Sequence, residues 1–105
     1  MMTAKRIPIP QEQISEFCRR WKVTELAVFG SAVGGNLTPE SDVDILVSFA
    51  PDTQVGLFDL AQMQMELESL FGRPVDLVEK AGLQNPYRRR EILRTSKVVY
   101  AAERT

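Results

Sequence analysis

The apolar positions near the N-terminus recur at helical spacing. They fall at i, i+3, i+4 and i+7, at Ile14, Phe17, Cys18 and Trp21. This spacing is the stripe that an amphipathic helix turns towards a core. We therefore interpret Trp21 and Cys18 as core residues of a first helix.

Two further helices are predicted downstream. Apolar residues at three- and four-residue steps predict a long helix over residues 57–71, and Gly72 is a plausible stop signal. Asn85 and Pro86 have the pattern of an N-cap followed by proline at the first helical position. A third helix is expected to follow, from Tyr87 to about Leu93.

Short apolar runs bounded by turn formers predict the strands. They cover residues 25–29, 41–47 and 74–78, with a last short strand at 98–101. The first two strands could pair parallel or antiparallel. Residues 31–40 are rich in glycine and turn formers and are expected to form a short helical turn followed by a loop. The order of elements predicts an α/β (α+β) fold with a small sheet and helices packed on one face.

Composition limits the class of protein. The chain has 105 residues, 44% hydrophobic and 26% charged, and is expected to be one globular domain over residues 1–105. A domain of this size buries one core with little to spare, which favours a partner. The formal net charge of −1 argues weakly against direct nucleic-acid binding.

The chain has no histidine and a single cysteine, Cys18. These counts exclude an internal disulfide, cysteine-rich zinc sites and Ser-His or Cys-His catalysis. Any chemistry must use carboxylates, hydroxyls, lysines, arginines or a hard metal ion. No apolar run approaches a membrane span, and the N-terminus lacks a signal-peptide pattern, so we expect a cytoplasmic protein without membrane contact.

Two acids stand in the second predicted strand. Asp42 and Asp44 are two positions apart and therefore project from the same face. The other face carries Val43, Ile45 and Val47. Neighbouring carboxylates repel each other unless a cation lies between them. Magnesium, which suits one or two carboxylates together with substrate phosphates, is the natural candidate.

Asp76 stands within the otherwise apolar third strand. If that strand lies beside the second, Asp76 reaches the same site as Asp42 and Asp44. Three carboxylates can hold two metal ions roughly 3.5–4 Å apart, as in two-metal phosphoryl-transfer sites. One ion would be bound by Asp42 and Asp44 with a triphosphate, and the other would be shared by all three acids. Asp76 is then the best candidate to take the proton of an acceptor hydroxyl.

Gly30 and Ser31 precede the acids by about one strand and loop. Glycine lets the backbone approach a phosphate closely, and the serine hydroxyl can donate to phosphate oxygens. Each residue alone has an ordinary explanation. Gly30-Ser31 is common in turns, Ser41 and Asp42 could cap a loop, and the remaining acids could be solvated surface residues. Their combination in this order favours a metal site.

The run from Phe29 to Gly35, followed after five residues by Ser41 to Val47, resembles the signature of the polymerase-β-like nucleotidyltransferase superfamily. Within it the chain resembles the minimal nucleotidyltransferases (MNT). The resemblance implies a small mixed sheet with helices packed against it. It also implies that Asp42, Asp44 and Asp76 are the catalytic and metal-binding acids. Gly30 and Ser31, with Ser41 beside the acids, are then the nucleotide-binding residues.

The reaction implied by the resemblance is transfer of a nucleoside monophosphate, AMP from ATP, to a hydroxyl with release of pyrophosphate. The cofactor would be two Mg²⁺ ions. Members are often encoded beside a HEPN-domain toxin and act as its antitoxin, some by adenylylating the partner and others by binding alone. In one respect the chain departs from the family: Gly34 stands where an arginine is frequent, after Val33 in place of alanine. This departure bears on nucleotide affinity.

A basic patch is expected on the third helix, from Arg88, Arg89, Arg90 and Arg94. A solvated helix face is the ordinary interpretation of such a run. The alternative is a contact with an acidic partner surface or with nucleic acid.

Overall fold

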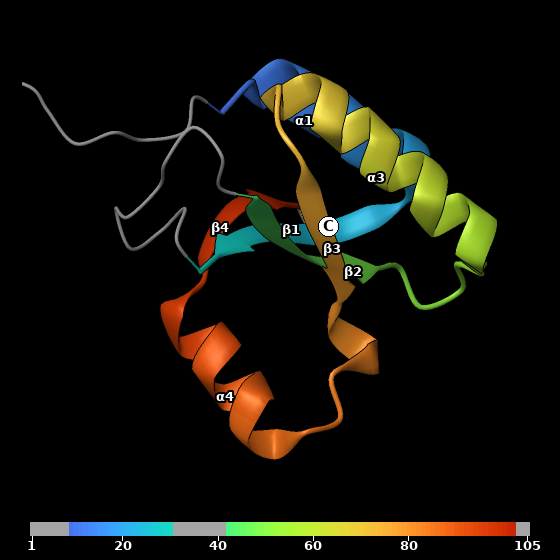
Figure 1. The fold of residues 1–105 in the computed structure, drawn as a ribbon. Helices are drawn as coiled ribbons and strands as arrows, with labels where there is room; N and C mark the ends of the chain where they lie inside the picture. Colours follow the sequence, from blue (N-terminus) through green and yellow to red (C-terminus); the bar gives the residue numbers. More distant parts are fainter. Residues whose placement is uncertain (1–8, 31–41, 103–105) are drawn as a thin grey trace, which may run out of the picture.

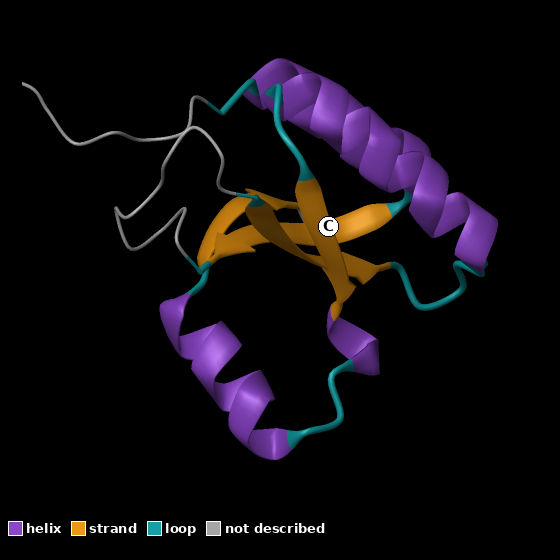
Figure 2. Ribbon diagram, viewed as in Figure 1, coloured by secondary structure: helices purple, strands orange, loops and turns teal. Residues whose placement is uncertain are grey.

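The computed structural model describes residues 9–30 and 42–102. These residues form a four-stranded sheet with helices on both faces (Figures 1 and 2). In chain order the elements are α1 (Gln11–Trp21), β1 (Val23–Phe29), β2 (Val43–Phe49), α3 (Leu57–Phe71), β3 (Val75–Glu79), the 3-10 helix η1 (Lys80–Gly82), α4 (Pro86–Thr95) and β4 (Lys97–Ala101).

The sheet is mixed. Its spatial order is β3-β2-β1-β4, and β1 pairs antiparallel with both β2 and β4. β2 and β3 pair in parallel, and α3 makes the crossover between them. Parallel neighbours need such a crossover because a short hairpin can join only antiparallel strands. The mixed sheet expected from the sequence is confirmed. The sequence left undecided whether the first two strands pair parallel or antiparallel, and in the structure they are antiparallel.

α1 and α3 cover one face of the sheet, where they lie side by side (Figure 1). The inward positions of β2 alternate with period two, as a strand with one face in a core requires. The centre of this core consists of residues that are fully buried: Ile14, Leu26, Val43, Ile45, Val47, Met63 and Leu67. The predicted stripe of the first helix is confirmed, since Ile14, Phe17 and Cys18 are buried and Trp21 packs at the edge of the core.

A shared carboxylate joins the two helices of this layer. Glu66 of α3 accepts hydrogen bonds from Trp21 Nε1 at 3.0 Å and from Arg20 Nη1 at 2.8 Å. Burial raises the pKa of Glu66, but these bonds and one from Gln62 outweigh it, so the pKa lies below the usual 4.5. The carboxylate therefore remains charged at neutral pH and ties α3 to the end of α1.

Gly72 ends α3 in the left-handed conformation, with φ of 72°, and its N–H donates to the Glu68 carbonyl at 2.8 Å. Glycine adopts this conformation without the steric cost that a side chain brings, which explains the stop. The predicted span of the helix and its stop signal are both confirmed. Within the described residues, no helix is long and apolar enough to cross a membrane.

α4 packs on the opposite face from α1 and α3, below the sheet in Figure 1. Its one buried residue, Ile92, contacts a second small core with Ala27, Phe29, Leu46 and Leu83. The expectation that helices pack on one face therefore holds for α1 and α3 and is wrong for α4. A helix with a single buried position leaves little periodicity from which its side of the sheet could be deduced.

The predicted cap of α4 is confirmed. The Asn85 side chain accepts hydrogen bonds from the N–H groups of Tyr87 at 3.0 Å and Arg88 at 3.2 Å. These bonds satisfy two amides that the first turn leaves without partners. The helix continues two residues past the predicted end, to Thr95, and β4 follows as expected. The turn and loop predicted for residues 31–40 lie outside the described residues.

Candidate active site

Two of the three predicted acids lie side by side on neighbouring strands. Asp44 on β2 is the register partner of Asp76 on β3, and on its other side it pairs with Phe29 of β1. Val43 and Ile45, the chain neighbours of Asp44, point into the core under α1 and α3. Asp44 therefore lies on the α4 face. The third strand lies beside the second, which is the condition under which the sequence predicts that Asp76 reaches the same site.

Asp42 precedes β2 rather than lying within it, because the strand begins at Val43. It remains electrostatically close to the pair. The pKa of the Asp44 carboxyl is raised, first by burial, then by the charge of Asp76 and then by that of Asp42. The three acids thus form one group of mutually repelling charges around Asp44.

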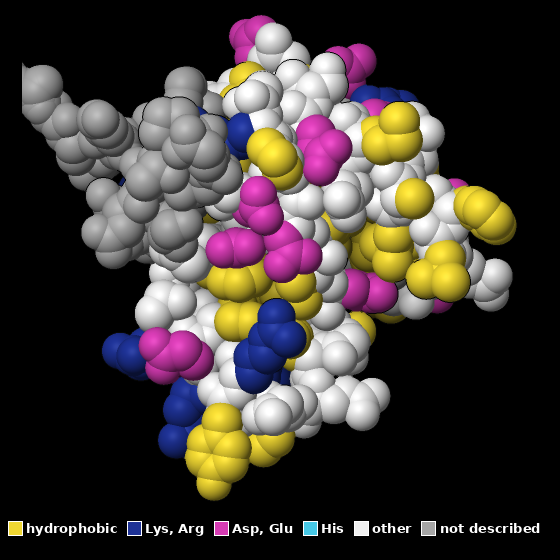
Figure 3. Space-filling model, in the orientation of Figure 1, with side chains coloured by type: hydrophobic (Ala, Val, Ile, Leu, Met, Phe, Trp, Pro, Cys, Tyr) yellow, Lys and Arg dark blue, Asp and Glu magenta, His cyan; other side chains and the backbone are white. Residues whose placement is uncertain are grey.

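Acidic side chains gather over the sheet in the space-filling view, with basic side chains below them across a hydrophobic strip (Figure 3). Asp42 and Asp76 are exposed, and Asp44 is half-buried. Within the described residues, no three acids converge into a preformed metal cage. Carboxylates with no cation between them repel. Magnesium retains water and takes one or two carboxylates with substrate phosphates, so this donor set fits it.

Relieving this repulsion is expected to stabilise the metal-free protein. The double substitution Asp42→Asn and Asp44→Asn should raise the melting temperature in chelator by a few degrees at neutral pH. A carboxyl whose folded pKa is raised destabilises the fold only once it ionises. The gain is therefore expected to shrink as the pH falls through the raised pKa of folded Asp44 and to be absent below the usual aspartate value of 3.8.

Thermal melts across this pH range, with an Asp52→Asn control, would measure the effect. Asp52 is exposed in the turn after β2. A double variant that melts below the parent protein at neutral pH would contradict the repulsion argument.

Gly30 ends β1 with φ of 74°, in the left-handed region. A Cβ built on it would collide with Asp44 Oδ2 and lie 3.3 Å from Asp44 Cγ. The backbone therefore passes directly beside the central carboxylate, where only glycine leaves room. The predicted nucleotide-binding residue Gly30 lies at the acids, whereas Ser31 and Ser41 lie outside the described residues.

Arg88 is a residue of this site that the sequence analysis did not connect with the acids. Its positive charge opposes the three effects that raise the pKa of Asp44. The sequence placed Arg88 in a basic patch whose ordinary interpretation is a solvated helix face. Its place beside the acids follows from α4 covering the face that carries Asp44, which no local sequence pattern indicates.

A central glycine beside a cluster of carboxylates, on a small mixed sheet, is an arrangement suited to metal-assisted phosphoryl transfer. The family model described as "nucleotidyltransferase domain" matches residues 11–99. The chain therefore belongs to the nucleotidyltransferase domain family and is a nucleotidyltransferase.

Individual relatives refine this picture. The protein adenylyltransferase MntA of Thermococcus cleftensis is 41% identical over 70 residues, which is 67% of this chain and 69% of the relative. A chain in a crystal structure of a toxin-antitoxin with AMP-PNP matches with a TM-score of 0.73 and 21% identity, over 90% of this chain and 76% of that chain.

A second similar structure is the complex of a tri-AMPylated Shewanella oneidensis HEPN toxin with MNT antitoxin. It matches with a TM-score of 0.64 and 19% identity, over 88% of this chain and 70% of that chain. At this identity, both structural likenesses establish the fold that the sequence predicted.

Proposed function

We propose that this nucleotidyltransferase transfers AMP from ATP to a hydroxyl of a partner protein, with Mg²⁺ as cofactor. The observation that carries the proposal is the pairing of Asp44 with Asp76 across β2 and β3, with the charge of Asp42 beside them. The relative named a protein adenylyltransferase supports a protein acceptor. We place the activity in the cytoplasm, where ATP is available.

Each acid has a role in this proposal. Asp42 and Asp44 would hold the Mg²⁺ ion that accompanies the triphosphate, and all three acids would share a second ion. Bound Mg²⁺ would supply charge neutralisation for the carboxylates and the phosphates. Asp76 accepts the proton of the acceptor hydroxyl. The hydroxyl oxygen forms a bond to the α-phosphorus, the bond from that phosphorus to the bridging oxygen of the β-phosphate breaks, and pyrophosphate leaves.

The backbone beside Asp44 contributes to nucleotide binding. Gly30 has no side chain between the chain and the central carboxylate, so its peptide can approach a phosphate. Ser31 and Ser41 are the proposed hydroxyl donors to the nucleotide. Positioning and charge neutralisation are the main demands that phosphoryl transfer makes on a protein.

The partner that we propose is a HEPN-domain toxin, with this chain as its antitoxin. Support comes from the similar fold in the Shewanella oneidensis complex, whose HEPN toxin is AMPylated and bound to an MNT antitoxin. A folded partner could reach the acids, because Asp42 and Asp76 are exposed on the described surface. The partner would then supply the acceptor hydroxyl.

The proposal is tested by incubating the protein with a HEPN-domain partner protein, Mg²⁺ and α-labelled ATP. We expect label on the partner, and none when Asp42→Asn and Asp44→Asn are combined or when Mg²⁺ is chelated. A γ-labelled ATP control separates AMP transfer from phosphorylation. A stable complex that never acquires label would reject AMP transfer and favour an antitoxin that acts by binding alone.

A further inference from the structure

Arg88 lies on the helix that covers the face of the sheet carrying Asp44. It lies in the first turn of α4, and its N–H is held by the Asn85 cap at 3.2 Å. Ile92 anchors the same helix against Phe29 and other residues of the α4 face. Phe29 is the register partner of Asp44. Helix and acids are therefore parts of one surface.

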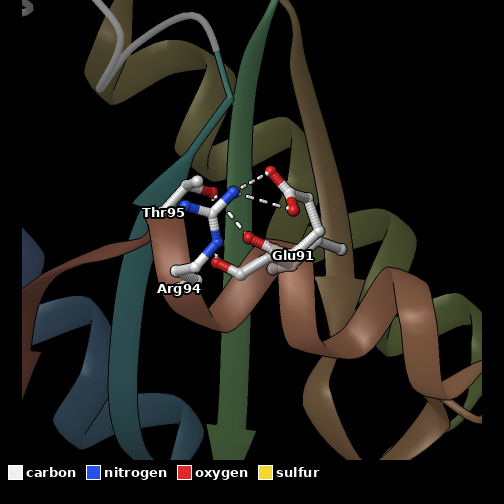
Figure 4. Close-up of polar contacts among 4 residues, drawn as sticks. Glu91, Arg94 and Thr95 are labelled. Carbon is white, nitrogen blue, oxygen red and sulfur yellow. Dashed lines mark hydrogen bonds and ion pairs between the residues drawn. The ribbon is translucent and has the colours of Figure 1, made fainter.

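The Arg88 guanidinium is exposed and has no hydrogen-bond or ion-pair partner among the described residues. Other arginines are engaged. Arg94 turns back onto Glu91 of its own helix, with contacts of 2.8 and 2.9 Å (Figure 4). Arg20 is paired with Glu66 at 2.8 Å. Arg88 is instead a cation near Asp44 without a direct contact, close enough to act on its charge.

This placement suits a ligand that brings both metal and negative charge. A divalent ion bound by the carboxylates would neutralise them and weaken the attraction between Arg88 and Asp44. The triphosphate that accompanies the ion would offer phosphate oxygens to the guanidinium in its place. A guanidinium binds phosphate through two parallel hydrogen bonds, with a geometry that an ammonium cannot match.

We propose that Arg88 binds the β- or γ-phosphate of the nucleoside triphosphate and is therefore part of the nucleotide site. The inference rests on the proposed function, because it takes the triphosphate to be bound at Asp42 and Asp44. It adds a contact to the part of the nucleotide that leaves as pyrophosphate. Arg88 would hold that group and stabilise the charge that develops on it during transfer.

The same helix provides a matched control. Arg90 is also an exposed arginine, two positions further on, and lines a shallow pocket with Pro86, Leu93 and Arg94. Replacing it removes the same charge from the same helix without touching the proposed phosphate contact. A long-range electrostatic effect would appear in both variants, whereas a direct contact would appear only at Arg88.

The test is calorimetric titration of the full chain with Mg²⁺ and AMP-PNP, and separately with AMP. Arg88→Ala is expected to weaken AMP-PNP binding about ten- to hundredfold. The affinity of the Arg88→Ala variant for AMP should equal that of the parent protein, because AMP lacks the β- and γ-phosphates. Arg88→Lys should recover part of the loss, and Arg90→Ala should bind both nucleotides as the parent does.

Undiminished AMP-PNP binding by Arg88→Ala would overturn the inference. So would an equal loss in Arg90→Ala, or an equal loss of AMP affinity, since either would indicate diffuse charge or altered folding. If the parent protein binds no AMP-PNP, both the proposed function and this inference are contradicted. If the parent protein binds AMP-PNP and the Arg88→Ala variant binds it equally well, only this inference is contradicted.

Discussion

Asp76→Asn is expected to lower the rate of AMP transfer about a thousandfold while leaving ATP bound. Asp76 is the acid on β3 that pairs with Asp44, and we assign it the proton of the acceptor hydroxyl. An amide cannot accept that proton at neutral pH. Asp42 and Asp44 would still hold the metal with the triphosphate, so the loss should fall on the catalytic rate rather than on affinity.

The contrast with Asp44→Asn makes this assignment testable. Asp44 is central to the cluster, because the charges of both other acids raise its pKa. Its replacement should lower the affinity for the nucleotide as well as the rate of AMP transfer. Single-turnover transfer and equilibrium ATP binding, measured on both variants, separate the two effects. Equal loss of ATP binding in the two variants would contradict separate roles for Asp76 and Asp44.

Gly30→Ala is expected to lower transfer on the order of a hundredfold, because a methyl group there displaces the Asp44 carboxylate. The colliding atom belongs to a short side chain that can rotate, so the carboxylate rather than the fold should yield. The positive φ of 74° adds a conformational cost of about 1–2 kcal/mol to the free energy of folding.

Gly72→Ala is the matched control for this prediction. Gly72 has nearly the same φ, 72°, but a Cβ there meets nothing within 4 Å. The two variants should therefore lose similar stability in denaturant unfolding, and only Gly30→Ala should lose activity. If Gly72→Ala were equally impaired in transfer, the loss would come from stability and not from the carboxylate.

Local patterns predicted most of the fold because most elements show their own signals. The stripe of α1, the Gly72 stop and the Asn85-Pro86 cap each follow from interactions within a few residues of the chain. The side of the sheet that α4 covers is a different matter. It depends on a single buried contact, that of Ile92 with residues distant in sequence, and the sequence-based expectation was wrong there.

The candidate site divides in the same way. Asp42, Asp44 and Asp76 were recognisable because acids in apolar strands conflict with their surroundings unless they have a function. Arg88 was not, because an arginine on an exposed helix conflicts with nothing. Its importance arises only when α4 is folded onto the face that carries Asp44. The structural role of Gly30 likewise emerged only from its closeness to that carboxylate.

β3 is the last strand on its side of the four-stranded sheet. Asp76 therefore lies on an edge strand, with an exposed side chain and no further described strand beyond it. An acceptor can approach such a residue laterally, without entering an enclosed cavity. Selectivity would then reside in the fit of two protein surfaces rather than in the shape of a small-molecule pocket. A folded protein could present one hydroxyl there while keeping the rest of its own structure intact.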